Sequence, residues 1–124
     1  MIYHKKLDPK GRIRIPHDFR DLLNDNILYL SKQFLKDGIF PYISISELDQ
    51  GEIVVIDKYG RTNPIPNDAL KFIGMKKDPK NSQEIVLATL YSPNYEIDIW
   101  NPEIWNEVDK ELNKKDKFTK TLDF

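Results

Sequence analysis

Six basic side chains gather between residues 5 and 20 of a chain that is almost neutral overall. The whole sequence has 19 Lys and Arg against 20 Asp and Glu, whereas this segment holds six cations and two carboxylates, a local charge of +4. The cations are Lys5, Lys6, Lys10, Arg12, Arg14 and Arg20. A local basic surface can bind a polyanion without a basic overall composition. Arginine on a two-stranded ribbon can also bind guanine in the major groove of DNA.

Alternation along this segment predicts which side chains face outward. A period of two places Ile13 and Ile15 toward a core and Arg12 and Arg14 on the opposite face. The same pattern is typical of a solvated strand whose cations only protect a sheet edge. Charge alone therefore leaves nucleic-acid binding and plain solvation open.

The sequence lacks the residue patterns that catalysis or metal binding would require. The chain has no cysteine, which excludes disulfides, thiolate nucleophiles and Cys-type zinc sites. His4 and His17 lack companion ligands at metal-binding spacing, and no phosphate loop or nucleophile elbow is present. We expect no enzymatic activity, no metal and no cofactor. Without an apolar leader or an apolar run of about 20 residues, we expect a cytoplasmic, nucleoid-associated protein and no membrane partner.

The chain of 124 residues contains an internal repeat. "DPKGRIRIPHDFRDLL" at residues 8–23 is echoed by "DKYGRTNPIPNDALKFIG" at residues 57–74. The aligned pairs are Asp8 with Asp57, Gly11 with Gly60, Arg12 with Arg61, Pro16 with Pro66, and Asp18 with Asp68. We therefore expect a first unit over residues 1–49, a second over residues 50–105, and a charged helix or tail over residues 106–124.

The pattern of each unit predicts six elements in this order: a strand, a tight turn, a second strand, a short helix, and two further strands. In the first unit, residues 1–7 and 12–16 flank the turn, and a helix from Pro16 would bury Phe19, Leu22 and Leu23. In the second unit, residues 51–57 and 62–66 flank the turn, and Gly74 would end the helix.

Each unit would end in a hairpin, residues 26–46 in the first and residues 83–100 in the second. A helix would follow, with Asn101 as N-cap and Ile104, Trp105, Val108 and Leu112 as its apolar stripe. One unit is too small to close a β structure. The fold class expected is mainly β with short helices (α+β), in which both units interleave into one barrel.

The aspartate of each motif has two possible roles. Its carboxylate could cap the turn through backbone N–H groups, which is ordinary chemistry before Pro-Lys-Gly. Alternatively it could orient the neighbouring arginine through an ion pair. The sequence favours the turn role without excluding the other.

"LDPKGRIRIPHDFRDLL" at residues 7–23 resembles the swapped-hairpin DNA-binding domain of the AbrB/MazE/SpoVT family. Two copies in one chain resemble the tandem MraZ proteins of this family. The two Asp-x-x-x-Arg motifs of those proteins match Asp8/Arg12 and Asp57/Arg61. Their Glu-Ile-Trp signature resembles residues 96–105. The resemblance implies a double-split β-barrel, regulation of transcription at double-stranded promoter DNA, and homo-oligomerisation into rings.

By this resemblance Arg12 and Arg61 would face DNA, and spacing adds Lys58 to the basic residues above. Asn63 stands where Arg14 stands in the first motif, which predicts weaker contact from the second copy. A different class is also open: an antitoxin-like module whose tail, residues 106–124, folds onto a protein partner.

Overall fold

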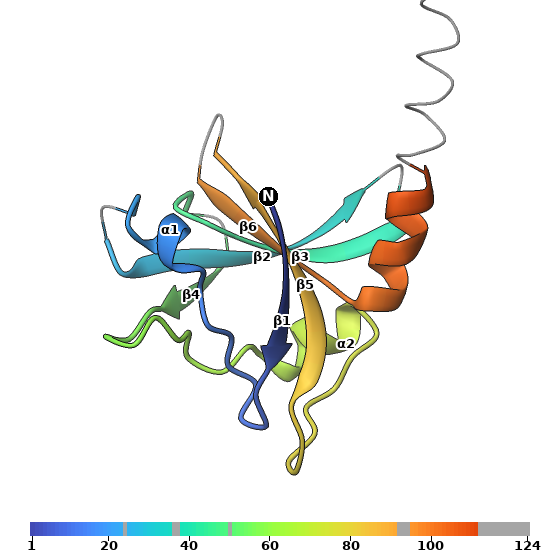
Figure 1. Cartoon of the computed structure of the whole chain (residues 1–124), viewed down its shortest axis with the longest axis horizontal. Helices are drawn as coiled ribbons and strands as arrows, with labels where there is room; N and C mark the ends of the chain where they lie inside the picture. The colour runs from blue at the N-terminus through green and yellow to red at the C-terminus, as the bar shows by residue number, and fades with distance from the viewer. Residues whose placement is uncertain (24, 36–37, 50, 92–94, 112–124) are drawn as a thin grey trace, which may run out of the picture.

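The computed structural model describes residues 1–23, 25–35, 38–49, 51–91 and 95–111 (Figure 1). A further helix, called here the C-terminal helix, covers residues 102–111. The other elements in chain order are β1 (Ile2–Leu7), α1 (His17–Arg20), β2 (Ile27–Leu35), β3 (Phe40–Ser46), β4 (Glu52–Val55), α2 (Asn67–Phe72), β5 (Gln83–Leu90) and β6 (Glu96–Trp100). The mainly β class with short helices is confirmed.

The strands form one antiparallel sheet in the order β1-β5-β6-β3-β2-β4. Both expected hairpins are present, β2 with β3 and β5 with β6. The first strand of each unit does not pair within its own unit: β1 lies against β5, and β4 lies against β2. Each unit therefore lends a strand to the other, and β3 joins β6 between them. This exchange makes the two repeats interdependent.

The segment after each first strand departs from the sequence prediction. Residues 12–16 were expected to return as a strand beside residues 1–7, but they pair instead with the second motif through an isolated bridge between Arg14 and Arg61. Ile15 N–H donates to the Gly60 carbonyl at 2.8 Å, and Thr62 N–H donates to the Ile13 carbonyl at 2.9 Å. We call this pair of segments, residues 11–15 and 60–65, the motif ribbon. Each motif supplies the backbone partners that the other lacks.

Helix α1 is shorter than expected, and this changes what it buries. It ends at Arg20, with Asp21 as its C-cap. Phe19 is fully buried and Leu23 packs against the core, but Leu22 is 42% exposed. The prediction that Leu22 shares the buried face is wrong, because the chain has left the helical path before reaching it.

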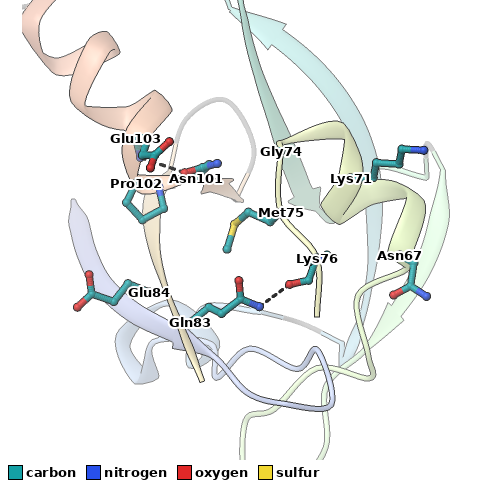
Figure 2. Close-up of a pocket in the computed structure, with 10 residues that line it drawn as sticks. All are labelled: Asn67, Lys71, Gly74, Met75, Lys76, Gln83, Glu84, Asn101, Pro102 and Glu103. Carbon is teal, nitrogen blue, oxygen red and sulfur yellow. Dashed lines mark hydrogen bonds between the residues drawn. The ribbon is translucent and has the colours of Figure 1, made fainter. Parts of the chain in front are cut away.

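The C-terminal helix begins as the sequence predicts (Figure 2). The Asn101 side chain accepts a hydrogen bond from Glu103 N–H at 3.0 Å, and Pro102 occupies the first helical position. Val108 packs on Val86, Ala88 and Trp100, with Ile104 and Trp105 at the margin. Leu112, the last residue of the expected stripe, lies outside the described residues. None of the described helices is long and apolar enough to cross a membrane.

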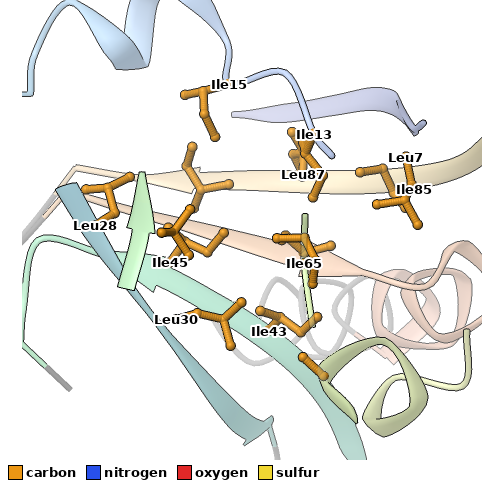
Figure 3. Packing of buried hydrophobic residues seen from close by; sticks show 14 of the residues in the cluster. Leu7, Ile13, Ile15, Leu28, Leu30, Ile43, Ile45, Ile65, Ile85 and Leu87 are labelled. Atoms are coloured by element: carbon orange, nitrogen blue, oxygen red, sulfur yellow. The ribbon is translucent and has the colours of Figure 1, made fainter. Parts of the chain in front are cut away.

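The main core lies on the opposite side of the sheet and draws on both units (Figure 3). Ile13 and Ile65 from the motif ribbon pack against strand residues such as Ile43 and Leu87, all of them almost fully buried. Burial of one such side chain stabilises by about 1.5–3 kcal/mol. The ribbon is thus anchored by its inward side chains, which leaves its other face for a different role.

Asp98 is a titratable residue within the sheet, on the face opposite the main core. It lies in register with Ser44, and its Oδ1 has no hydrogen-bond partner. Desolvation, together with a hydrogen bond and the charge from Glu96, raises the pKa of Asp98 from 3.8 to about 9. At neutral pH this carboxyl is therefore protonated in the folded protein.

Asp98→Asn tests this state through the pH dependence of stability. Because the folded protein holds the proton more tightly than the unfolded chain, the free energy of unfolding of the wild type should fall as pH rises from 3.8 toward about 9. The amide cannot ionise, so the variant should gain about 1–3 kcal/mol at pH 8 and lose most of this slope. Urea titrations at several pH values measure the free energy of unfolding of both proteins. The exposed Asp109→Asn is the control, and an unchanged slope in Asp98→Asn would contradict the assignment.

Candidate nucleic-acid interface

The motif ribbon presents arginine on its outer face. Ile13 and Ile15 point inward and are 1% and 3% exposed, as the alternation predicts. Arg14 is exposed, and Arg12 and Arg61 are half-buried. Arg14 and Arg61 occupy directly opposed positions of an antiparallel bridge. Like charges directly opposite each other work against a sheet, and the ion pair of Arg61 with Asp57 at 3.3 Å offsets part of this repulsion.

Asp8 performs both roles that the sequence left open. Its Oδ1 accepts the backbone N–H groups of Lys10 at 3.0 Å and Arg12 at 2.8 Å, which closes the turn. Its Oδ2 accepts Arg12 Nε at 2.7 Å. The guanidinium is therefore held in one orientation through Nε. Its terminal nitrogens are available to a ligand in this geometry.

The second motif repeats this arrangement. Asp57 Oδ1 accepts the N–H groups of Tyr59 at 2.8 Å and Arg61 at 2.9 Å, and Oδ2 accepts Arg61 Nε at 3.3 Å. The Tyr59 ring lies 5.2 Å from the Arg61 guanidinium and 5.1 Å from Lys58 Nζ. Two equivalent turns thus each fix one arginine.

These hydrogen bonds also set the acidity of the two aspartates. Partial burial acts to raise the pKa of Asp8, but the backbone and guanidinium hydrogen bonds from Arg12 outweigh it and lower the pKa. The backbone N–H of Arg61 is the main cause of the lowered pKa of Asp57. Both carboxylates stay ionised well below neutral pH, so the hydrogen bonds that close the turns persist in mildly acidic solution.

The glycine of each turn is covered by a cation from another segment. Gly11 and Gly60 have φ of 83° and 82°, which glycine adopts without strain. A Cβ at Gly11 would clash with the side chain of Lys77, and a Cβ at Gly60 would clash with the guanidinium of Arg20. Sequence analysis missed Lys77, because the loop after α2 has no motif. The repeat offers no signal for it either, because Arg20, the cation that covers the other glycine, lies within α1.

Three of the predicted cations line one hollow. Lys5, Arg14 and Arg20 border a depression of about 250 Å³, together with His17 and Tyr59. No carboxylate is among the residues that line it. Arg20 is also 3.5 Å from His17 Nδ1. The hollow therefore joins cations from β1, the motif ribbon and α1.

The other predicted cations lie outside the hollow. Lys6 lies on the face of β1 opposite Lys5, in register with Glu84 of β5. Lys10 and Lys58 are exposed in the two turns. The structure therefore brings Lys5, Arg14 and Arg20 together, and it does not bring Lys6 to the same surface.

A larger groove of about 990 Å³ lies between α2, the start of β5 and the start of the C-terminal helix (Figure 2). Lys71 and Lys76 line it, but so do Glu84 and Glu103. The Gln83 amide donates to the Lys76 carbonyl across its floor. This mixture of charges suits a polyanion less well than the hollow.

Comparisons with known proteins leave the family open. No family model, no curated protein and no solved structure matches the chain. Among the residues that the structure describes, no three His, Asp or Glu side chains form a group able to hold a metal ion. The function is therefore argued from the geometry of the ribbon and its cations.

Asp8→Asn tests the contribution of the carboxylate to the first turn. A carboxylate with a lowered pKa stabilises the fold above the unfolded value of 3.8, and this contribution is lost as pH falls through the folded value. The variant should lose about 0.5–1.5 kcal/mol at pH 7 and converge with the wild type in acid. Chemical denaturation at both pH values measures the difference. The exposed Asp49→Asn serves as control, and a deficit that persists in acid would argue against the ion pair.

Proposed function

We propose that this protein is a sequence-specific regulator of transcription that binds double-stranded DNA with the outer face of the motif ribbon. One observation carries the proposal: Arg14 and Arg61 occupy opposed positions on that face, where Arg14 is exposed and Asp57 holds the Arg61 guanidinium. Such a concentration of arginine suits a phosphate backbone. Plain solvation, the alternative that charge left open, would not require the aspartate of each motif to hold its arginine.

The fold proposed is a double-split β-barrel of two swapped-hairpin units. The exchange of β1 and β4 between the units supports it. So does the ribbon, which runs between the two edge strands of the sheet: Asp8 N–H donates to the Arg12 carbonyl at 2.9 Å on one side, and Ile56 bridges Thr62 on the other. Both features agree with the resemblance to the AbrB/MazE/SpoVT family and its MraZ members.

In the proposed mechanism, phosphate contacts position the protein and base contacts specify the sequence. Lys5, Arg20 and Lys10 would bind phosphates, because they surround the ribbon rather than project from it. Arg12 and Arg14 would read base edges, since they lie on the ribbon face. The Asp8 carboxylate reduces the entropy that Arg12 loses on binding, because its Nε is already held at 2.7 Å.

Self-association with a second copy is also proposed. Ile27, Ile53 and Val55 are exposed by 40%, 58% and 46% on the outer face of β2 and β4. Ile27 and Val55 are in register, so the three side chains form one apolar surface. Light scattering should give a mass above the 14.6 kDa of one chain. Ile53→Ser with Val55→Ser should lower it, and a monomeric wild type would refute the proposal.

The alternative prediction, a protein partner for residues 106–124, remains a hypothesis. Residues 112–124 lie outside the described residues. Within the described part of this segment, Val108 is already used to pack the C-terminal helix on the sheet. No contact in the described residues favours this function over DNA binding.

Arg12→Ala combined with Arg14→Ala tests the proposed interface. Loss of two arginines that bind base edges should weaken binding to a selected duplex by about 100-fold or more, at about 1–3 kcal/mol for each contact. Gel-shift titration measures affinity, and circular dichroism checks that the fold persists.

The matched control removes the same charge elsewhere. Lys71→Ala with Lys76→Ala alters the groove near α2 and should change affinity by less than about threefold. Equal losses in the two double variants would show that only net charge matters. An unchanged affinity in the arginine variant would refute the proposed site.

A further inference from the structure

The two ends of the motif ribbon are related by the repeat but differ in charge. The turn of residues 8–11 lies beside the loop after α2, whereas the turn of residues 57–60 lies near α1 (Figure 1). We call these the first-turn end and the second-turn end. In a symmetric dimer of identical units, both ends would carry the same side chains. The single chain is free to differentiate them.

The three first-unit cations that line the hollow have no basic counterparts in the second unit. Lys5 on β1 aligns with Val54 on β4, Arg14 with Asn63, and Arg20 with Leu70. Val54 and Leu70 are buried in the core. The hollow lined by Lys5, Arg14 and Arg20 therefore has no equivalent made from the aligned residues.

Asn63 is also committed to the fold. Its Oδ1 accepts Val55 N–H at 2.9 Å, and its own N–H donates to the Val55 carbonyl at 3.1 Å. The side chain thus satisfies the backbone of edge strand β4 rather than projecting toward a ligand. Arg14, in the corresponding place, is exposed.

The result is an unequal distribution along the ribbon. Arg14 pairs with Arg61, Arg20 covers Gly60, and Tyr59 lines the hollow, so all the first-unit cations of the hollow lie at the second-turn end. That end carries Lys5, Arg14, Arg20, Lys58 and Arg61. The first-turn end carries Lys10, Arg12 and Lys77, and Lys80 follows in the same loop. Sequence comparison alone predicted weaker contact from the second motif, whereas this placement strengthens the second-turn end.

We infer that the protein binds duplex DNA in one fixed orientation, on a two-part site whose half beneath the second-turn end is required and whose other half is tolerant. The inference rests on the proposed DNA-binding function. Lys5 and Arg20 bind one backbone phosphate in the hollow at the required half, and Arg14 at its border reads a base edge, because no carboxylate is among the residues that line this depression. The site bound by one chain is thus directional rather than palindromic.

The first experiment selects binding duplexes from a random library with the full chain. Each half of the selected site is then scrambled in turn. Scrambling the required half should weaken binding by about 100-fold, and scrambling the other half by less than about fivefold. Equal losses for the two halves would overturn the orientation. No binding to any duplex would overturn the proposed function itself, so the two failures are distinguishable.

The second experiment reads orientation directly. The chain has no cysteine, so Lys80→Cys gives a unique attachment point for a DNA-cleaving iron chelate. Lys80 is exposed in the loop that carries Lys77 to the first-turn end. On a duplex that holds the site of one chain, cleavage should occur on the tolerant side alone, and cleavage on both sides would overturn the inference.

Variants connect the orientation to the hollow. Arg14→Asn gives the first motif the residue of the second, and it should reduce the difference between the two scrambled halves to below about threefold. Arg20→Ala should reduce the slope of log affinity against log salt by about one, because one phosphate contact is lost. Lys71→Ala is the matched control and should change neither value. An Arg14→Asn variant that still discriminates fully between the halves would contradict the assignment to Arg14.

Discussion

The backbone pairing between the two motif segments is the contact on which the rest of the molecule depends. Ile13 and Thr62 meet at its centre, where Thr62 N–H donates to the Ile13 carbonyl at 2.9 Å and Thr62 Oγ1 accepts Ile13 N–H at 3.2 Å. A buried backbone group without a partner costs about 1–3 kcal/mol. In both motifs these groups find their partners in the other motif rather than in their own. The repeat therefore folds as a pair, and the pairing itself creates the arginine face.

The turn aspartates show how one short motif serves fold and site together. A carboxylate has two oxygens, and in both turns one oxygen binds the backbone while the other binds arginine Nε. The turn shape and the arginine orientation are thus set by the same group. This also explains why the question posed by the sequence had no single answer: spacing alone cannot distinguish the oxygens of one carboxylate.

Local pattern predicted most of the elements, but not their partners. Alternation gave Ile13 and Ile15 as buried, and cap chemistry gave the start of the C-terminal helix at Asn101. Both properties depend on near neighbours in the chain. The pairing of β1 with β5, the contact of Lys77 with Gly11, and the end of α1 before Leu22 depend on residues distant in sequence. No periodicity within a segment encodes such contacts, so the expected strand of residues 12–16 was assigned to the wrong partner.

When both units belong to one chain, the residues that meet at their junction need not be identical, as they must be in a symmetric dimer. Asp98 lies opposite Ser44 where β3 and β6 join, and these two positions correspond under the strand exchange. In a symmetric dimer they would carry the same residue, and two buried aspartates opposite each other would repel when ionised. Serine on one side leaves a single carboxyl, which can be protonated and remain buried. The same freedom allows Asn63 to support β4 while Arg14 stays exposed. The two motifs thus share one scaffold, while different residues at matched positions support the backbone in one motif and leave an arginine exposed in the other.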